Sequence, residues 1–103
     1  LRSVANIAGS DNCTVCINNN QNIVSFGMSY YGAHGHEEKD VFPPKIISSL
    51  NHIISISTYG DYCVCLDNDG NVFTFGRSKN GQLGIGDEVA SYTHIPQKVN
   101  LPP

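Results

Sequence analysis

The sequence predicts an all-β protein in which one four-stranded antiparallel unit occurs twice. The first observation is internal repetition, because residues 16–27 align without gaps on residues 65–76, a shift of 49 positions. The second is composition, since the clearer copy contains short runs rich in β-branched and aromatic residues, bounded by turn residues. The third is that no stretch shows a convincing 3.6-residue amphipathic period. Helices are therefore not expected.

The repeat extends in both directions from this segment. Upstream, Ile7 stands 49 positions before Ile56. Downstream, residues 43–46 match residues 96–99 once an insertion of a few residues around Ser91 is allowed. This alignment equates Lys45 with Lys98. The predicted domain and its repeats have these extents: 1–103 for the whole domain, about 4–50 for the first repeat and about 51–103 for the second.

Each copy is predicted to contain four short strands joined by tight turns. A hairpin turn at residues 67–70 connects the second and third strands of the second copy, and Gly70 supplies its positive φ. In the first copy Gln21 stands at this position, and glutamine tolerates a positive φ poorly. The strands of the second copy are expected at residues 53–57, 62–66, 71–75 and, more weakly, 96–99.

Composition and charge exclude several classes of function. The formal net charge is -3 with only 6 Lys and Arg residues, which leaves no basic stripe for the phosphates of DNA or RNA. No apolar run approaches the roughly 20 residues of a membrane-spanning helix, and the N-terminus lacks the pattern of a secretory signal. We therefore expect a soluble, unsecreted protein of the cytoplasm or nucleus that binds neither nucleic acid nor membranes directly.

A family resemblance rests on two consecutive segments of the second copy. The hairpin GDYCVCLDNDGNVFTFG at residues 60–76 is followed by the string GQLGIGD at residues 81–87. Together they resemble a regulator of chromosome condensation repeat, strongly over residues 53–100 and more distantly over residues 4–47. The resemblance implies a β-propeller of seven blades in which each repeat contributes strands to adjacent blades. The predicted fold class is thus two four-stranded antiparallel blades of such a propeller.

The sequence departs from the family pattern at a few positions. Where the family usually has His after its turn glycine, this chain has Cys13 and Tyr62, and Phe26 and Phe75 replace the usual Trp. The first copy lacks the GQLGIGD string and has GAHGHEE at residues 32–38 instead. We expect the fold to survive these changes and the loop of the first copy to be the most individual part of the chain.

Two repeats do not close a propeller. Propellers have about 4 to 8 blades, and repeat proteins need about three units before every apolar face is covered. The chain also begins at Leu1 rather than Met and ends at Leu101-Pro102-Pro103. We therefore expect further repeats in a longer parent protein. Assembly of several copies into one ring, or marginal stability of the segment alone, are the alternatives.

Four cysteines form two close pairs, Cys13 with Cys16 and Cys63 with Cys65, and a Cys₄ zinc site draws on two such pairs. However, residues three apart on a strand point to opposite faces, which separates Cys13 from Cys16. Cys16 and Cys65 are also equivalent in the repeat, where the family usually has a small apolar residue. We expect buried, free cysteines and no metal.

Two further motifs resemble ligand loops only in part. Residues 67–71 resemble the start of a calcium loop, but Val72 and Ser78 stand where glycine and a bidentate Glu are required. Residues 76–81 have the glycine spacing of a phosphate loop, but Gln82 follows in place of Lys. Both segments are better explained as turns between strands, so no cofactor is expected.

The loop of the first copy carries His34 and His36 beside acidic residues at positions 37, 38 and 40. This grouping is compatible with a metal or pH-responsive patch, with a solvated loop, or with a partner contact. His34 also stands at the position of Leu83, which favours a packed core histidine. Nothing in the sequence assembles a catalytic triad, and we do not expect an enzyme.

The predicted function is a protein-interaction module whose loops at one end of the propeller contact another protein. The alternative implied by the resemblance is a guanine-nucleotide exchange factor for a Ran-like small GTPase. In that case loops of the full propeller would stabilise the nucleotide-free GTPase without covalent chemistry. The candidate contact residues are Tyr30, Tyr31, His34, His36, Glu37, Glu38, Asp40, Arg77, Lys79, Asp87, Glu88 and Tyr92.

Overall fold

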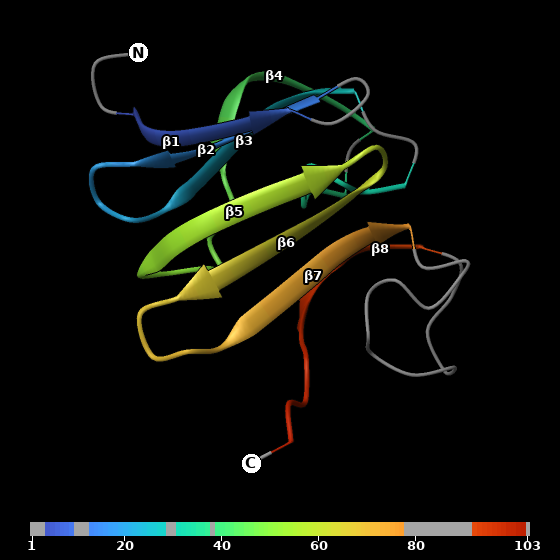
Figure 1. Cartoon of the computed structure of the whole chain (residues 1–103). Helices are drawn as coiled ribbons and strands as arrows, with labels where there is room; N and C mark the ends of the chain where they lie inside the picture. Colours follow the sequence, from blue (N-terminus) through green and yellow to red (C-terminus); the bar gives the residue numbers. More distant parts are fainter. Residues whose placement is uncertain (1–3, 10–12, 29–30, 38, 78–91, 103) are drawn as a thin grey trace.

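The computed structural model consists of two four-stranded antiparallel sheets (Figure 1). It describes residues 4–9, 13–28, 31–37, 39–77 and 92–102. In this described part no helix is present that is long and apolar enough to cross a membrane. The strands are β1 (Val4–Gly9), β2 (Cys13–Asn18), β3 (Ile23–Met28), β4 (Asp40–Ile46), β5 (Ile53–Tyr59), β6 (Tyr62–Asp67), β7 (Val72–Arg77) and β8 (Tyr92–Lys98).

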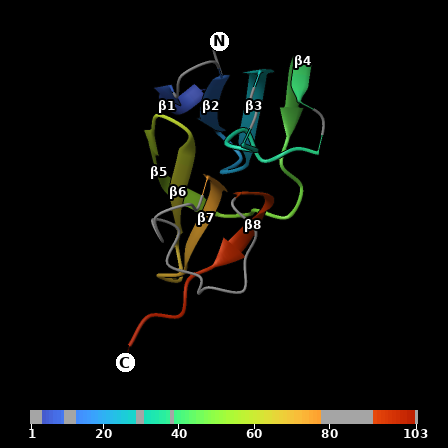
Figure 2. The same cartoon turned by 90° about the vertical axis from the view of Figure 1, so that its right-hand side faces the viewer.

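Strand order follows the sequence in each sheet, β1-β2-β3-β4 and β5-β6-β7-β8. The chain therefore crosses from the fourth strand of the first sheet to the first strand of the second. Strands β1 and β2 contact β5, while β4 and β8 lie on the opposite side of their sheets (Figure 2). We call β1 and β5 the inner strands and β4 and β8 the outer strands. This arrangement is that of two consecutive propeller blades, as predicted.

Strand pairing confirms the 49-residue repeat. Val15 of β2 pairs with Ser25 of β3, and Val64 of β6 pairs with Thr74 of β7. Each member of the second pair stands 49 positions after its counterpart in the first. Equivalent residues therefore occupy equivalent places in the two sheets, and the environment of one can be compared directly with that of the other.

The pairing of the outer strands corrects the downstream alignment. Lys45 pairs with Ser25, and Gln97 pairs with Thr74. Since Ser25 and Thr74 are equivalent, Lys45 corresponds to Gln97. The sequence match had equated Lys45 with Lys98 and was wrong by one residue.

The error arises at a bulge in each outer strand, where the sequence match equated Pro43 with Pro96 although Pro44 is the equivalent residue. The register of β3 with β4 shifts between Ser25 and Gly27, and that of β7 with β8 shifts at the equivalent place. The bulges contain Pro43 and Pro44 in β4 and Pro96 in β8. Proline cannot donate a backbone hydrogen bond, so it is tolerated at bulges and on edge strands. Because the bulge adds residues without ending the strand, β8 also begins earlier than predicted, at Tyr92.

The main hydrophobic core lies between the two sheets rather than within either one. Both sheets and the segment that links them contribute side chains, all of them buried. Burial of such side chains stabilises the pair by roughly 1.5–3 kcal/mol for each large residue. The members of this core are Val15, Ile17, Ile23, Ile47, Leu50, Ile53, Ile56, Cys63, Cys65 and Phe75.

The same side-chain to backbone bonds close both hairpins. Asn18 Oδ1 accepts from the backbone N–H groups of Asn20 and Asn22, both at 3.0 Å. Asp67 Oδ1 accepts from the two equivalent N–H groups, at 3.0 and 2.8 Å. The Asn71 side-chain amide also donates to Asp67 Oδ2 at 3.0 Å, and these bonds hold the pKa of Asp67 below its usual value. Asn and Asp at this position fix the turn in either copy.

Replacement of Gln21 by glycine is expected to stabilise the protein. Gln21 has φ 62°, and its counterpart Gly70 has φ 86°. A residue with a Cβ in this region carries a conformational strain of about 1 kcal/mol or more, which glycine removes. Glycine also raises the entropy of the unfolded chain, so only part of this strain energy is gained as stability. We expect Gln21→Gly to raise the unfolding free energy by about 0.5–1 kcal/mol in urea titrations. Asn20→Gly, one residue earlier and without a positive φ, should lower it.

The loop between β3 and β4 reaches the second sheet. Gly32, with φ +75°, packs so closely on β8 that a Cβ there would lie 2.6 Å from His94 Cα. Gly35, in the same loop, packs against Ile47 and Phe75 of the core. The loop of the first copy is thus a second point of contact between the repeats, on the outer side of the molecule.

Candidate protein-interaction surface

The longest connections lie at one end of the two sheets. There β3 ends and β4 begins, with Met28 paired to Asp40, and β7 ends and β8 begins, with Arg77 paired to Tyr92. The turn between β5 and β6 lies at the same end, on the right of Figure 1. We call this the loop end, and the opposite end, with the turns after Asn18 and Asp67, the hairpin end.

Four side chains from both repeats meet at the loop end. The Arg77 guanidinium donates to Asp61 Oδ2 at 3.2 Å, and Arg77 Cζ lies 4.7 Å from the centroid of the Tyr31 ring. Tyr31 in turn contacts Tyr92 edge to face, with ring centroids 6.3 Å apart. We call Tyr31, Asp61, Arg77 and Tyr92 the tyrosine–arginine cluster. Tyr31 comes from the first repeat and the other three from the second, so the cluster bridges the two blades.

Two further tyrosines continue this surface toward the inner strands. Tyr59 and Tyr62 flank the turn that carries Asp61, and their rings stack with centroids 5.2 Å apart. The backbone N–H of Arg77 donates to the carbonyl of Asp61 at 2.9 Å, which fixes the turn against the end of β7. Tyr59 and Tyr92 are both exposed. Aromatic surface is therefore presented from the inner to the outer strands of the second blade.

The electrostatics of the cluster suit a contact that excludes water. Arg77 and Asp61 are each about one-third exposed and form an ion pair, so the guanidinium is already compensated. Its face remains stacked on Tyr31, and a cation over an aromatic ring contributes about 0.5–2 kcal/mol as the site loses water. Tyr and Arg are also the side chains most enriched at the energetic centres of protein interfaces. The arrangement is thus suited to binding a protein.

The two histidines of the first loop are buried. His34 is only 1% exposed; its Nε2 lies 2.9 Å from the carbonyl of Lys39, and its Nδ1 accepts from the backbone N–H of His36 at 3.3 Å. His36 Nε2 lies 3.2 Å from the carbonyl of Lys45. The Ser25 hydroxyl donates to the His34 carbonyl. Both rings therefore hold the loop together.

The other predicted contact residues are distributed differently. The structure brings Tyr31, Arg77 and Tyr92 together, whereas Glu37 and Asp40 are exposed outside the cluster. Sequence reasoning missed the aromatic pair and the carboxylate around Gly60, although the tyrosine that replaces the family's histidine was a signal. The predicted residues outside the described part of the chain are Tyr30, Glu38, Lys79, Asp87 and Glu88.

All four cysteines are free and buried. Cys63 and Cys65 belong to the core between the sheets. A hydrogen bond with Cys65, burial, and the neighbouring thiols of Cys65 and Cys13 raise the pKa of Cys63 well above its usual value. Among the described residues, no three His, Cys, Asp or Glu side chains are placed to share a metal ion.

This environment predicts inert thiols and a loss of stability in alkali. Because the Cys63 pKa is raised in the folded state, the folded protein retains a proton that the unfolded chain loses above about pH 8.5. The unfolding free energy should therefore fall as pH rises from about 8.5. Urea titrations at pH 7 and pH 9.5 should show this fall, and Cys63→Ala should reduce it. In the native state a thiol-specific reagent should modify none of the four cysteines within minutes, and all four after unfolding.

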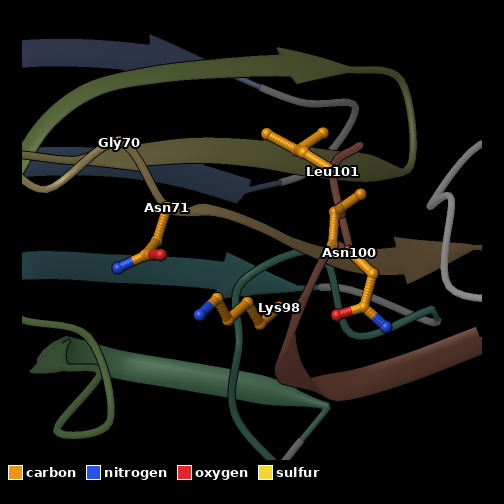
Figure 3. Close-up of a pocket in the computed structure, with 6 residues that line it drawn as sticks. Gly70, Asn71, Lys98, Asn100 and Leu101 are labelled. Carbon is orange, nitrogen blue, oxygen red and sulfur yellow. The ribbon is translucent and has the colours of Figure 1, made fainter. Parts of the chain in front are cut away.

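The hairpin end carries a separate cavity of about 260 Å³ beside the turn of the second copy. Gly70 and Asn71 form one part of its lining, and residues 98–101 form the rest (Figure 3). In the first copy the carbonyl of Gln21, equivalent to Gly70, accepts from the N–H of Ile53 at 2.9 Å. The turn of the first hairpin thus holds the start of the next inner strand. Its counterpart in the second copy borders the cavity.

Comparison with known proteins agrees with this architecture. Models of the regulator of chromosome condensation (RCC1) repeat match residues 53–82 and 69–103. No curated protein sequence matches the chain. Yeast RCC1 (Prp20), in its crystal structure with Kap60 bound, has 18% identity and a TM-score of 0.86 over 97% of this chain and 23% of its own.

Two further solved structures give the same result. Human WBSCR16 has 22% identity and a TM-score of 0.82 over 94% of this chain and 25% of its own. Prp20p from Saccharomyces cerevisiae, studied with its binding properties to Gsp1p and histones, has 17% identity and a TM-score of 0.83 over 96% of this chain and 24% of its own. The chain thus spans about a quarter of the length of these proteins. Residues 53–103 thus match the regulator of chromosome condensation repeat, and the chain as a whole has the fold of two blades of a β-propeller.

Proposed function

We propose that the chain supplies two neighbouring blades of a larger propeller whose loop end binds another protein. The observation that carries the proposal is the tyrosine–arginine cluster, because it joins side chains of both repeats into one surface. A rigid pair of blades holds these side chains in place before a partner arrives, so little conformational entropy is lost on binding.

Further blades are supported by the open face of the second sheet. Val15 and Ile17 of the first sheet are fully buried by the second sheet. Their counterparts Val64 and Leu66 are only half-buried. A third blade that packed on the second blade, in the way that the second packs on the first, would bury these two side chains. It would also close the cavity at the hairpin end.

The face of the first sheet that points away from the second sheet is also open. Ile56 and Phe75 of the second sheet are buried against the first, while their counterparts Ile7 and Phe26 are exposed and half-buried respectively. A preceding blade would cover them in the same way. Additional repeats in a longer parent, seven in total as the family resemblance implies, would satisfy both faces, and copies of the same chain are the alternative.

The loop-end surface is tested by comparing partners captured by the protein and its variants from the same extract. Tyr92→Ala and Arg77→Ala should each reduce specific capture about tenfold or more, which corresponds to a loss of about 1.4 kcal/mol or more in binding. Asn20→Ala, an exposed change at the hairpin end, should leave capture unchanged. Circular dichroism confirms that each variant is folded. Equal capture by all four proteins would contradict the proposal.

Guanine-nucleotide exchange is a second candidate, favoured by the structural similarity to Prp20p and its reported binding to Gsp1p. Loops of the full propeller would then bind the nucleotide-free GTPase more tightly than the loaded one, and this difference would drive nucleotide release. The experiment adds the intact parent protein to a panel of GDP-loaded small GTPases. Accelerated GDP release by one of them would support exchange. Unchanged release across the panel would leave only the protein-interaction role.

A further inference from the structure

A groove that shares no residue with the tyrosine–arginine cluster lies on the outer side of the molecule, between the two blades. Its volume is about 390 Å³, within the range of sites that hold a small ligand or a few side chains. It is lined by residues 45–49 of the first repeat, which we call its first wall, by residues 94–96 of the second repeat, and by residues 35–37 of the first loop. We call it the rim groove.

The β8 side of the rim groove is apolar. Ile95 is 55% exposed, and Pro96 lies beside it. Both residues belong to the bulge of β8 described above, which lifts them away from the regular ladder. A partner's aliphatic side chain can therefore be buried against them.

The backbone of Ile95 beside the groove is already hydrogen-bonded. The N–H of Ile95 donates to Thr93 Oγ1 at 3.1 Å, and its carbonyl accepts from Thr93 Oγ1 at 3.0 Å and from Gln97 Nε2 at 3.2 Å. A partner strand would have to break these bonds in order to pair with β8 at this residue. At Ile95 an occupant is therefore recognised through the side chain.

The first wall also offers hydrogen-bond donors. Leu50 N–H donates to the carbonyl of Ile47 at 3.2 Å, so Ser48 and Ser49 occupy the centre of a tight turn. Within the described chain, neither their backbone N–H groups nor their hydroxyls bond to protein atoms, and both residues are exposed. Lys45 lines the same wall and contributes positive charge. Glu37 also lines the groove, and its negative charge disfavours an anion beside it.

From this complementarity we propose that the rim groove binds a segment of a partner protein that presents a branched aliphatic side chain next to a carboxylate. The aliphatic group packs against Ile95 and Pro96, and the carboxylate accepts hydrogen bonds from Ser48 and Ser49 beside Lys45. Such charge-assisted bonds are about twice as strong as neutral ones. The proposal goes beyond the loop-end surface and does not depend on it.

The experiment is a titration of the isotope-labelled protein with the capped peptide acetyl-Gly-Leu-Glu-Gly-amide, followed by NMR. We expect saturable shifts of the amide signals of Ile46, Ser48, Ser49 and Ile95, with a Kd in the millimolar range, as expected for a ligand of this size. Matched peptides with Gln in place of Glu, or Ala in place of Leu, should each bind at least about threefold more weakly.

Protein variants separate this site from other surfaces. Ile95→Ser and Lys45→Gln should weaken binding of the Leu-Glu peptide about threefold or more. Ile54→Ser, at an isoleucine of similar exposure outside the groove, should not change it. Absence of saturable shifts in the wild-type protein, shifts centred elsewhere, or equal binding of the three peptides would overturn the proposal. Because Tyr92 and Arg77 do not line the groove, failure here leaves the loop-end proposal unaffected.

Discussion

Gly32→Ala is expected to lower the unfolding free energy by about 3 kcal/mol or more, a fall in melting temperature of at least about 12 °C for a domain of this size. The new Cβ would lie 2.6 Å from His94 Cα and 2.8 Å from its backbone nitrogen. Both are backbone atoms of β8, so no side-chain rotation can relieve the clash. The loop of the first repeat must withdraw from the second sheet, or β8 must move. Thermal unfolding followed by circular dichroism measures the effect.

Gly70→Ala provides the matched control. Gly70 also has a positive φ, +86°, but a Cβ there would meet nothing within 4 Å. Its replacement should therefore cost only the conformational strain, about 1 kcal/mol. Equal losses at the two positions would show that the close contact between the first loop and β8 does not form in solution.

Phe75→Ala is expected to cost about 3–5 kcal/mol, because it leaves a cavity in the core between the sheets. Phe75 is the largest fully buried side chain of the described chain, at 0% exposure. It contacts the first loop near Gly35 as well as the inter-sheet core. Urea titration should show a lower midpoint at an unchanged slope if the variant still unfolds in one step.

Phe26→Ala tests the same position in the other repeat. Phe26 is half-buried, since in this chain no blade covers its face of the first sheet. The expected loss is about 1 kcal/mol in the 103-residue chain. In a longer parent with a preceding blade the loss should approach that of Phe75→Ala. A loss at Phe26 equal to that at Phe75 in this chain would contradict the placement of the core between the two sheets.

The fold could be predicted from the sequence because its determinants are local and occur twice. The turn formers at Asn18 and Asp67, and the alternating side chains of the strands that follow, stand 49 positions apart. Each position therefore had an independent check in the other copy. The bulges of β4 and β8 escaped prediction because their extra residues have no paired partner, and a proline can be aligned to either neighbour without penalty.

The candidate site was only partly predictable. Tyr31, Arg77 and Tyr92 could be proposed as surface residues by type, but their convergence depends on how two sheets pack. Asp61 was not predicted, since a single carboxylate in a turn gives no sign of function in the sequence. Its role follows from the structure, which places Arg77 3.2 Å away. His34 is the opposite case, because its equivalence to Leu83 favoured a packed core histidine, and the structure buries it.

The segment that joins the two blades has a consequence for how the protein can come apart. Ile47 and Leu50 lie in this connection and are buried in the core, and the N–H of Ile53 bonds back to the first hairpin. The boundary between repeats is therefore not a boundary between domains. Ser48 and Ser49 are exposed between these buried anchors, but cutting the chain at this point would expose the apolar interior of both halves at once. We therefore expect the two repeats to unfold together rather than one at a time.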